Sequence, residues 1–169
     1  MDNKKVRGCI INGYLSFIEM KWGRFGKEEC LENLEINGKI KDGYYYPNKI
    51  KISILRWIKE NKGENYIEDA GKYLIKNLRM LSWLVRYDTP FKVAKKIEKE
   101  FEEIYTFGKM KIRGEKGKIN VFLQTATEDD VTCLAYKGVL KGILEKTNYP
   151  GTVDIKYCKD KSCEYEVRY

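Results

Sequence analysis

The 169-residue chain contains no histidine. Because imidazole is the usual general base and a frequent metal ligand near neutral pH, its absence excludes a Ser-His-Asp or Cys-His nucleophile, His-ligated zinc and His-ligated haem. Cysteine is scarce: 5 residues are too few for a disulfide-built fold, and the odd number leaves at least one thiol unpaired within the chain. No apolar run approaches the roughly 20 residues of a membrane-spanning helix, and the charged start, Met1 to Arg7, lacks the apolar stretch of a signal peptide. These shortages predict a cytoplasmic protein in a reducing compartment, with no membrane partner.

What the chain does contain is typical of one ordinary domain. Its length suits a single domain or two lobes packed together, and 43% hydrophobic residues favour a folded core over disorder. The formal charge of +8 comes mainly from lysines that alternate with glutamates, as between Lys95 and Glu100. That alternation is typical of a solvated helix face, so we expect no specific nucleic-acid partner.

The first part of the chain has helical spacing of its apolar residues. Ile11, Leu15 and Ile18 recur at i, i+4 and i+7, which predicts a helix that ends at glycines 23 and 26. The residues 36–47 read as a loop. Further helices are expected at 27–34, at 48–61 with Asn48 as the cap, from 65 to about 85, and at 90–104 after the start signal Asp88-Thr89-Pro90.

The last part has strand-like alternation. A hairpin is expected around Glu115-Lys116-Gly117, followed by a helix over 130–146 and two strands joined by the polar loop between Cys158 and Cys163. The sequence therefore predicts an α+β fold: a single domain over 1–169, in which a helical N-terminal lobe (1–104) packs on a C-terminal antiparallel β-β-α-β-β lobe (105–169). One helix is expected on the face of the sheet.

Small residues form a stripe on the helix over 130–146. Ala135, Gly138 and Gly142 lie at i, i+3 and i+7, and each glycine costs a helix roughly 0.8–1.0 kcal/mol relative to alanine. Close approach of another group would explain this cost. Sheet packing is the first alternative, and a ligand cavity between this helix and the N-terminal lobe is the second.

Three cysteines form a second constellation. Cys158 and Cys163 can face each other across the last hairpin, and Cys133 lies near the start of the preceding helix. Free thiols, a Cys158–Cys163 disulfide, and a zinc site completed by Asp154 or Glu164 are the alternatives, in that order.

No catalytic set is visible. The segment Gly23-Arg24-Phe25-Gly26 lacks the strand and the Lys-Ser/Thr ending of a phosphate-binding loop, and no carboxylate pair stands apart from the charged helix faces. The Tyr44-Tyr45-Tyr46-Pro47 run could stack bases, but such a run is more typical of a loop packed on a core. We therefore expect no catalytic residues and no enzymatic activity.

The order of short motifs resembles a known superfamily. Val6-Arg7-Gly8, Trp22-Gly23, Tyr45-Tyr46-Pro47, Ala70-Gly71, Tyr105-Thr106-Phe107-Gly108, Cys133 with Lys137-Gly138 and Gly142, and Cys158 with Cys163-Glu164-Tyr165-Glu166-Val167 follow one another in that order. The chain resembles the haem-nitric-oxide-binding (H-NOX)-like superfamily, and its last third is similar to the 4-vinyl-reductase-type small-molecule-binding domains of the same broad group. The resemblance implies an intracellular sensory domain that holds a ligand between a helical lobe and a sheet with a covering helix, and that signals to a partner.

The chain also departs from this superfamily. Haem-binding members carry a ligating His on the helix that corresponds to 90–105, and a Tyr-x-Ser-x-Arg motif for the haem propionates; the chain has neither. We therefore expect no haem bound in the manner of the family, and haem with a Tyr or Cys ligand is an alternative. In the 4-vinyl-reductase-type sensors, cysteines near the matching positions bind zinc, and the Cys158–Cys163 spacing is shorter here.

Three functions follow. The first is a haem-independent sensor of a hydrophobic small molecule, with a protein signalling partner and a homodimer as an open alternative. Its pocket is predicted to be lined by Leu78, Leu81, Trp83, Leu84, Phe91, Ile97, Phe101, Leu134 and Gly138. The second is a partner-binding scaffold with a filled core, which a cavity smaller than about 300 Å³ would favour. The third is haem sensing through a ligand other than histidine.

Overall fold

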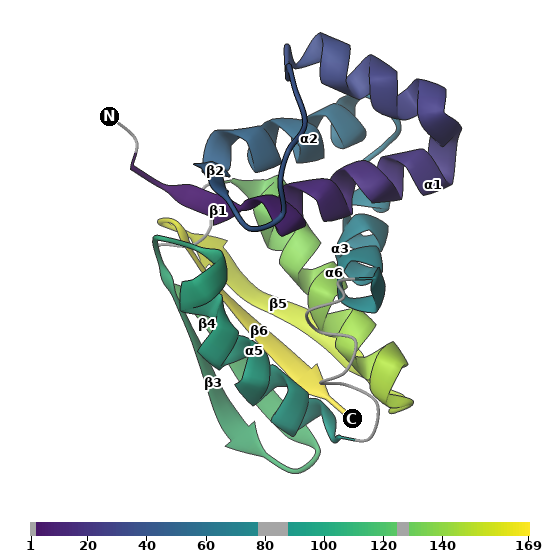
Figure 1. Cartoon of the computed structure of the whole chain (residues 1–169). Helices are drawn as coiled ribbons and strands as arrows, with labels where there is room; N and C mark the ends of the chain where they lie inside the picture. Colours follow the sequence, from purple (N-terminus) through teal and green to yellow (C-terminus); the bar gives the residue numbers. More distant parts are fainter. Residues whose placement is uncertain (1–2, 78–87, 125–128) are drawn as a thin grey trace.

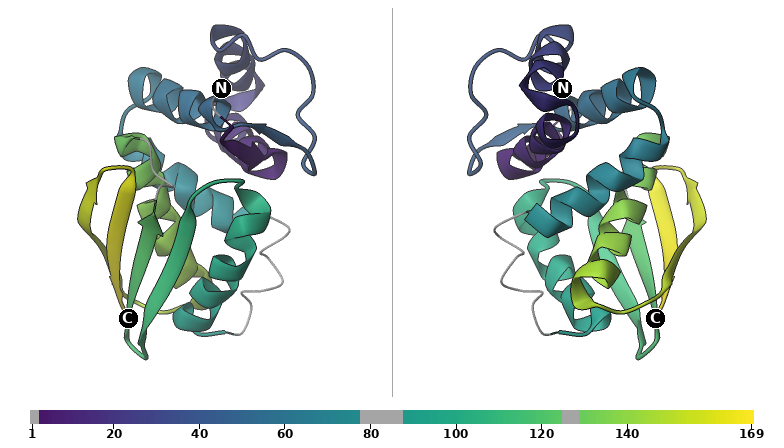
Figure 2. Two further views of the ribbon diagram at one scale, coloured as in Figure 1. Left: turned by 90° about the vertical axis from the view of Figure 1, so that its left-hand side faces the viewer. Right: turned by 90° about the vertical axis from the view of Figure 1, so that its right-hand side faces the viewer.

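The computed structural model describes residues 3–77, 88–124 and 129–169, which form five helices and six strands (Figure 1). In chain order these are β1 (Lys5–Arg7), α1 (Gly8–Asn33), β2 (Tyr45–Pro47), α2 (Asn48–Asn61), α3 (Asn65–Asn77), α5 (Pro90–Ile104), β3 (Lys109–Glu115), β4 (Lys118–Gln124), α6 (Asp130–Thr147), β5 (Thr152–Lys159) and β6 (Ser162–Arg168). The side views in Figure 2 show α1 and α2 stacked above the sheet lobe. The α+β prediction, a helical N-terminal lobe on an antiparallel C-terminal sheet, is confirmed.

The predicted helix break near residue 23 is confirmed in part. Gly23 has φ 74° and ψ 179°, a non-helical conformation that kinks α1 and that residues with a side chain rarely adopt. Gly26 does not break the helix. It is buried after the kink, where a Cβ atom would stand 2.8 Å from Cβ of Trp22.

A two-stranded ribbon was not predicted. β1 and β2 pair antiparallel, with Val6 opposite Tyr46, and Val6 also bridges to Tyr105. The expected loop over 36–47 therefore ends in a strand. Three-residue strands whose partners lie about forty residues away leave no periodicity for a sequence pattern to detect.

Of the two helix caps predicted from the sequence, the one ahead of Pro90 is confirmed. Thr89 caps α5 ahead of Pro90, and the Asp129 side chain caps α6 by accepting a hydrogen bond from the Thr132 amide at 3.0 Å. The expectation for Asn48 is wrong: Pro47 holds the cap position of α2, and Asn48 is already helical and buried. α3 ends at Asn77, and the rest of the helix expected to about residue 85 lies outside the described residues.

The main sheet has the order β3-β4-β6-β5 and is antiparallel throughout. Two helices lie against it rather than one, because α5 contacts β3 while α6 contacts β5 and β6. Alternate residues of β3 and β4 are buried, as in Met110, Ile112, Val121 and Leu123. The helix assigned by sequence to the end of the N-terminal lobe therefore also covers the sheet.

The glycine stripe of α6 packs on a helix, and the expected sheet packing is wrong. A Cβ atom on Gly138 would overlap the carbonyl oxygen of Glu68 in α3, and one on Gly71 of α3 would overlap the carbonyl oxygen of Ala135. The two backbones approach so closely that the loss of helix propensity is offset by contact along both helices. α3 and α6 thus join the two lobes directly.

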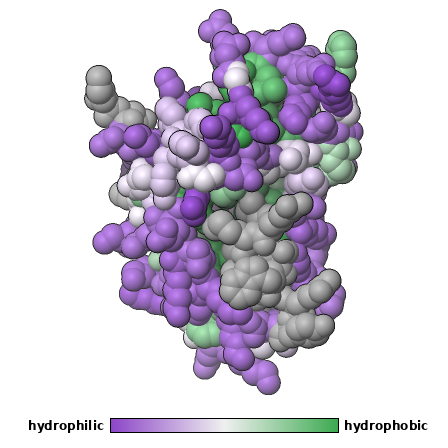
Figure 3. All heavy atoms as spheres, viewed as in Figure 1, coloured by the Kyte–Doolittle hydropathy of each residue, from purple (hydrophilic) through white to green (hydrophobic). Residues whose placement is uncertain are grey.

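The charged surface is largely satisfied locally. Hydrophilic residues dominate the part of the face drawn in Figure 3 that belongs to described residues. Lys137 and Lys141 pair with Glu68, and Lys72 and Lys76 pair with Glu145. Among the described helices, none is both long enough and apolar enough to cross a membrane.

Candidate functional site

Cys133, Cys158 and Cys163 converge at one end of the sheet lobe. Cys158 and Cys163 are directly opposed in the β5–β6 ladder, with Cα atoms 4.2 Å apart, and Cys133 in the first turn of α6 lies 6.7 and 6.8 Å from them. The register of β5 shifts between Ile155 and Tyr157, which inserts one extra residue. Because side chains alternate along a strand, this bulge turns Cys158 to the face that carries Cys163.

The three sulfur atoms all lie within 4.8 Å of one another. One cysteine sulfur can form only one S–S bond, so at most one pair can be a disulfide, and the third sulfur lies beside that pair. Three sulfurs around one point fit a single soft cation such as Zn²⁺, which takes thiolate ligands in a tetrahedral shell. The residues present therefore fit the metal that the 4-vinyl-reductase-type resemblance implies, with three thiolates as its ligands.

The expected fourth ligands do not join this cluster. Asp154 pairs with Glu166 and Glu164 with Phe122 across the ladder, on the face of the sheet opposite to Cys163. No carboxylate of the described residues belongs to the group of ligand atoms that the three sulfurs form. The prediction of Asp154 or Glu164 as a zinc ligand is wrong because strand alternation points both side chains away.

Tyr165 fixes the position of Cys133. Its buried hydroxyl donates to the Cys133 carbonyl at 2.8 Å and lies 3.4 Å from Sγ of the same residue. Burial raises the pKa of Tyr165 well above its usual range. The side chain therefore remains a protonated donor at the first turn of α6.

The interior beneath α5 is almost full. The described residues enclose a cavity of about 10 Å³ between α5, the sheet and α6, which is room for one water molecule at most. Its lining is apolar apart from Tyr136 and Tyr165. Among the residues that the structure describes, no apolar cavity of ligand size lies between these elements.

The residues predicted to line one pocket lie in several places. Leu78, Leu81, Trp83 and Leu84 fall outside the described residues. Ile97 lines the small interior cavity, Phe101 stacks on Tyr105 at 4.8 Å between ring centroids, and Phe91 packs at the edge of the core. Leu134 lines a groove beside the cysteines, and Gly138 contacts α3. The described members of this set are not brought together around one cavity.

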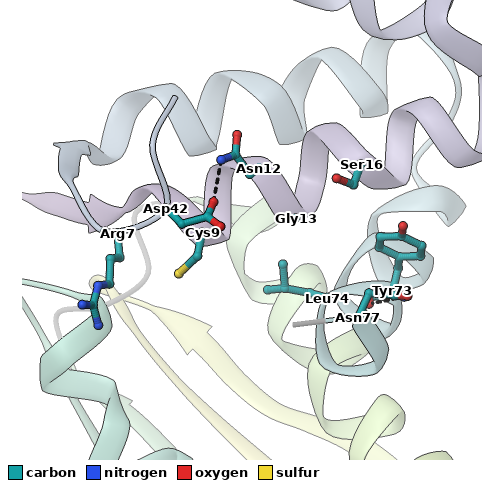
Figure 4. A pocket seen from close by; sticks show the side chains of 10 residues that line it. Arg7, Cys9, Asn12, Gly13, Ser16, Asp42, Tyr73, Leu74 and Asn77 are labelled. Carbon is teal, nitrogen blue, oxygen red and sulfur yellow. Dashed lines mark hydrogen bonds between the residues drawn. The ribbon is translucent and has the colours of Figure 1, made fainter. Parts of the chain in front are cut away.

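A larger hollow lies between α1, the 42–43 loop and the end of α3 (Figure 4). It measures about 510 Å³, within the range of small-molecule sites. Its described lining mixes polar and apolar groups: Arg7, Cys9, Asn12, Gly13, Ser16, Asp42, Gly43, Tyr73, Leu74 and Asn77. We call it the α1–α3 pocket.

Polar groups at one end of this pocket are partly committed. The Asn12 side-chain amide donates to Oδ1 of Asp42 at 2.7 Å and to the Ile40 carbonyl at 3.0 Å. Nε of Arg7 is shielded from solvent and has no hydrogen-bond partner among the described residues. Burial raises the pKa of the Cys9 thiol, opposed by the nearby Arg7 charge, so the thiol stays protonated near neutral pH.

Comparison with solved structures relates the whole chain to one fold. An H-NOX protein from S. oneidensis matches with a TM-score of 0.75 at 13% identity, over 96% of this chain and 95% of that one. An oxygen-binding H-NOX domain related to soluble guanylate cyclases matches at 0.73 and 12%, over 96% and 93%. The chain has the H-NOX fold. An H-NOX protein from K. algicida is also similar, with a TM-score of 0.66 at 14% identity over 96% of this chain and 95% of that one.

The sequence comparisons add no further relative of this H-NOX fold. No family model matches the chain, and no curated protein does. At 11–14% identity the structural likeness establishes the fold and nothing about the ligand.

Haem does not fit the described residues in the manner of this fold. The chain has no imidazole to ligate iron, and the interior beneath α5 leaves about 10 Å³. Tyr136, which lines that interior, is packed against Tyr105 at 6.5 Å between ring centroids.

The sequence pattern missed the α1–α3 pocket. Its lining comes from β1, α1, a loop and α3, and no single segment carries a recognisable motif. Gly13 was the available sequence signal for this site, because a glycine inside a helix often indicates that another group packs closely there. In the structure that group is the end of the Leu74 side chain.

Proposed function

We propose that this chain is a cytoplasmic ligand-binding sensor domain, without enzymatic activity, that binds a small organic molecule in the α1–α3 pocket and not haem. One observation carries the proposal: a hollow of about 510 Å³ opens in the helical lobe of an H-NOX fold, whereas the described residues beneath α5 leave a cavity of about 10 Å³. Pockets of this size with a few polar groups are typical of small-molecule sites.

The lining favours an amphipathic acid as the ligand. Leu74 and Gly13 offer an apolar surface, and Arg7 contributes a guanidinium to the lining. A guanidinium binds a carboxylate through charge-assisted hydrogen bonds. A medium-chain fatty acid or an aromatic carboxylate therefore suits the pocket better than a purely apolar molecule.

A bound metal would act as a brace in this sensor. Held by Cys133, Cys158 and Cys163, it would tie the first turn of α6 to the β5–β6 hairpin. Zn²⁺ contributes folding free energy at such a site without redox chemistry. α6 is also the helix that α3 contacts. The metal would therefore fix the position of α6, and the helical lobe would move relative to it.

Ligand binding can be tested by blocking the pocket. Ser16→Phe places a large ring in the α1–α3 pocket, and Met20→Phe is a matched control because Met20 is exposed one turn further along α1. Octanoate, decanoate and phenylacetate are the probes. A carboxylate that binds only the folded state at 100 times its Kd adds about 2.7 kcal/mol to the unfolding free energy. We expect a higher Tm in the wild type and in Met20→Phe but not in Ser16→Phe.

Two results would contradict the sensor. If no probe raises Tm and native mass spectrometry of the purified protein finds no bound small molecule, the pocket has no ligand function. A Soret band after incubation with haem would instead favour haem bound through a ligand other than histidine.

A second candidate is a partner-binding scaffold that needs no ligand, which the small cavity of about 10 Å³ among the described residues beneath α5 favours. In that case Ser16→Phe leaves every property unchanged except stability. Affinity capture by wild type and by Ser16→Phe separates the two functions: equal capture of one partner, with no ligand effect, supports the scaffold.

A further inference from the structure

The three-cysteine cluster lies at the floor of a groove. A hollow of about 420 Å³ opens beside Cys133 and Cys158, and Leu134 and Ile155 form apolar parts of its wall. Cys158 is exposed, whereas Cys133 and Cys163 are buried. A cation on the three sulfurs would therefore have protein on one side and this groove on the other.

Three of the four acidic side chains that line the groove, Glu64, Asp129 and Asp130, are engaged elsewhere. Asp129 accepts the Thr132 amide with one oxygen and pairs with Arg56 at 3.0 Å with the other. Asp130 and Glu64 both pair with Lys59, the latter at 2.8 Å. None of these carboxylates belongs to the group of ligand atoms that the sulfurs form.

Two lysines and the fourth acidic residue also line the groove. Lys159 and Lys161 line it and make no ion pair with the described residues. Asp160, between them, is exposed at the tip of the two-residue turn, with φ 52°. The groove thus offers two apolar walls and two ammonium groups to a molecule from solution.

We propose that the metal centre keeps its fourth coordination position open to this groove, where a small anionic donor from solution, a thiolate above all, replaces a bound water. The inference rests on the metal part of the proposed function. Three protein ligands with an exchangeable fourth are the arrangement of a reactive zinc site, whereas a purely structural site is closed by four protein ligands. In the exchange the water leaves, the thiol sulfur binds the metal, and the thiol proton passes to solvent.

The experiment uses the full chain loaded with Co²⁺ in place of Zn²⁺, because the visible absorption of Co²⁺ reports its donor set. A phosphine keeps the cysteines reduced, so that no thiol is present before the probe is added. We expect one Co²⁺ per chain. Added 2-mercaptoethanol should shift the visible bands and saturate, and cyanide should do the same.

Two variants assign the site. Cys158→Ser removes one thiolate and should weaken metal binding by more than about 100-fold, since even partners outside the ligand shell are worth about 10–100-fold. Cys30→Ala is the matched control, because Cys30 is buried in α1 and lies outside the cluster. It should bind one Co²⁺ with the spectrum of the wild type.

Two outcomes of the Co²⁺ experiment would overturn the proposal. A chain that binds no metal while all three thiols titrate as reduced has no metal centre. A spectrum that ignores both probes means that the protein supplies the fourth ligand. Neither result touches the α1–α3 pocket, whose function the Ser16→Phe comparison tests separately.

Discussion

The two sides of α3 differ in how closely they meet their neighbours. On one side α3 contacts α6 backbone to backbone, through Gly71 and Gly138. On the other it faces α1 across a hollow of about 510 Å³, where Gly13 meets only the end of the Leu74 side chain. Glycine thus serves two purposes around α3: it brings two helix backbones into contact, and it accommodates the end of a side chain. The α3–α6 contact, which we call the α3–α6 joint, connects the helical lobe to the sheet lobe. On the side of α3 that faces α1, the α1–α3 pocket has room for a ligand.

The closed side should be the most sensitive to added volume. In Gly138→Ala the new Cβ would overlap the Glu68 carbonyl oxygen, a backbone atom that cannot move without shifting α3. Overpacking of this kind costs about 1–3 kcal/mol or more, which exceeds the roughly 1 kcal/mol that alanine gains in helix propensity. We expect a net loss of about 2 kcal/mol in the free energy of unfolding, measured by urea denaturation.

Gly142→Ala is the control on the same stripe. Its Cβ would stand 3.1 Å from the Lys72 carbonyl oxygen, a tight contact that a small shift relieves. The net change should stay within about 1 kcal/mol. Equal losses in Gly138→Ala and Gly142→Ala would contradict this geometry. They would show that the loss of stability does not depend on the distance between the new Cβ and the carbonyl oxygen of α3.

The other face of α6 is held by a side chain rather than by close backbone contact. Tyr165→Phe removes the hydroxyl that donates to the Cys133 carbonyl at 2.8 Å. A buried hydrogen bond of this kind contributes about 1 kcal/mol, and we expect a loss of that size. Tyr149→Phe, at a partly exposed tyrosine that contacts Tyr169 edge-on, should change stability by less than half as much. Equal losses in thermal unfolding would contradict the anchoring role of Tyr165.

Sequence patterns predicted what is local and missed what depends on contacts between distant segments. The cap at Thr89 and the alternation around Val121 each depend on neighbours within a few residues, and each prediction is confirmed. The glycine stripe correctly predicted a close neighbour but not its identity, because α3 and the sheet would both suit small residues. Which element covers a helix face is decided by the whole fold.

The candidate sites show the same limit. The facing of Cys158 and Cys163 followed from their positions in a hairpin, and the structure confirms it. The fourth ligand did not follow. Glu164 comes directly after Cys163, so strand alternation alone places it on the other face of the sheet. For Asp154 the extra residue between Ile155 and Tyr157 decides, and a bulge leaves no periodic signal in the sequence.

The open side of α3 should tolerate volume that the closed side does not. In Gly13→Ala the new Cβ meets the terminal methyl of Leu74, which can rotate into the α1–α3 pocket. Helix propensity offsets the crowding, so the unfolding free energy should change by less than about 1 kcal/mol. The same variant should weaken carboxylate binding, read as a smaller rise in Tm with decanoate. A loss as large as that of Gly138→Ala would remove the distinction between the two sides.

The outer face of the sheet, where charges replace close packing, should give the smallest effect at neutral pH. Glu166 is surrounded by Lys118 at 2.7 Å, Lys156 at 3.3 Å and Arg168 at 2.5 Å. The hydrogen bond from Lys118, with the other cations, lowers the pKa of Glu166 from 4.5 to about 2. Since the folded state holds the proton more weakly, the stabilisation is complete above pH 4.5 and is lost as the pH falls towards 2.

An acid titration of the unfolding free energy measures this contribution. Between pH 4.5 and 2 the wild type should lose stability more steeply than Glu166→Gln, which has no proton to gain. Glu115→Gln, at an exposed strand end with no ion pair to the described residues, should keep the slope of the wild type. Parallel curves for all three proteins would mean that the cations around Glu166 do not act on it in solution. In that case the backbone packing between α3 and α6 would contribute still more to the unfolding free energy, relative to the ion pairs of Glu166. Packing against a backbone atom does not depend on pH or salt.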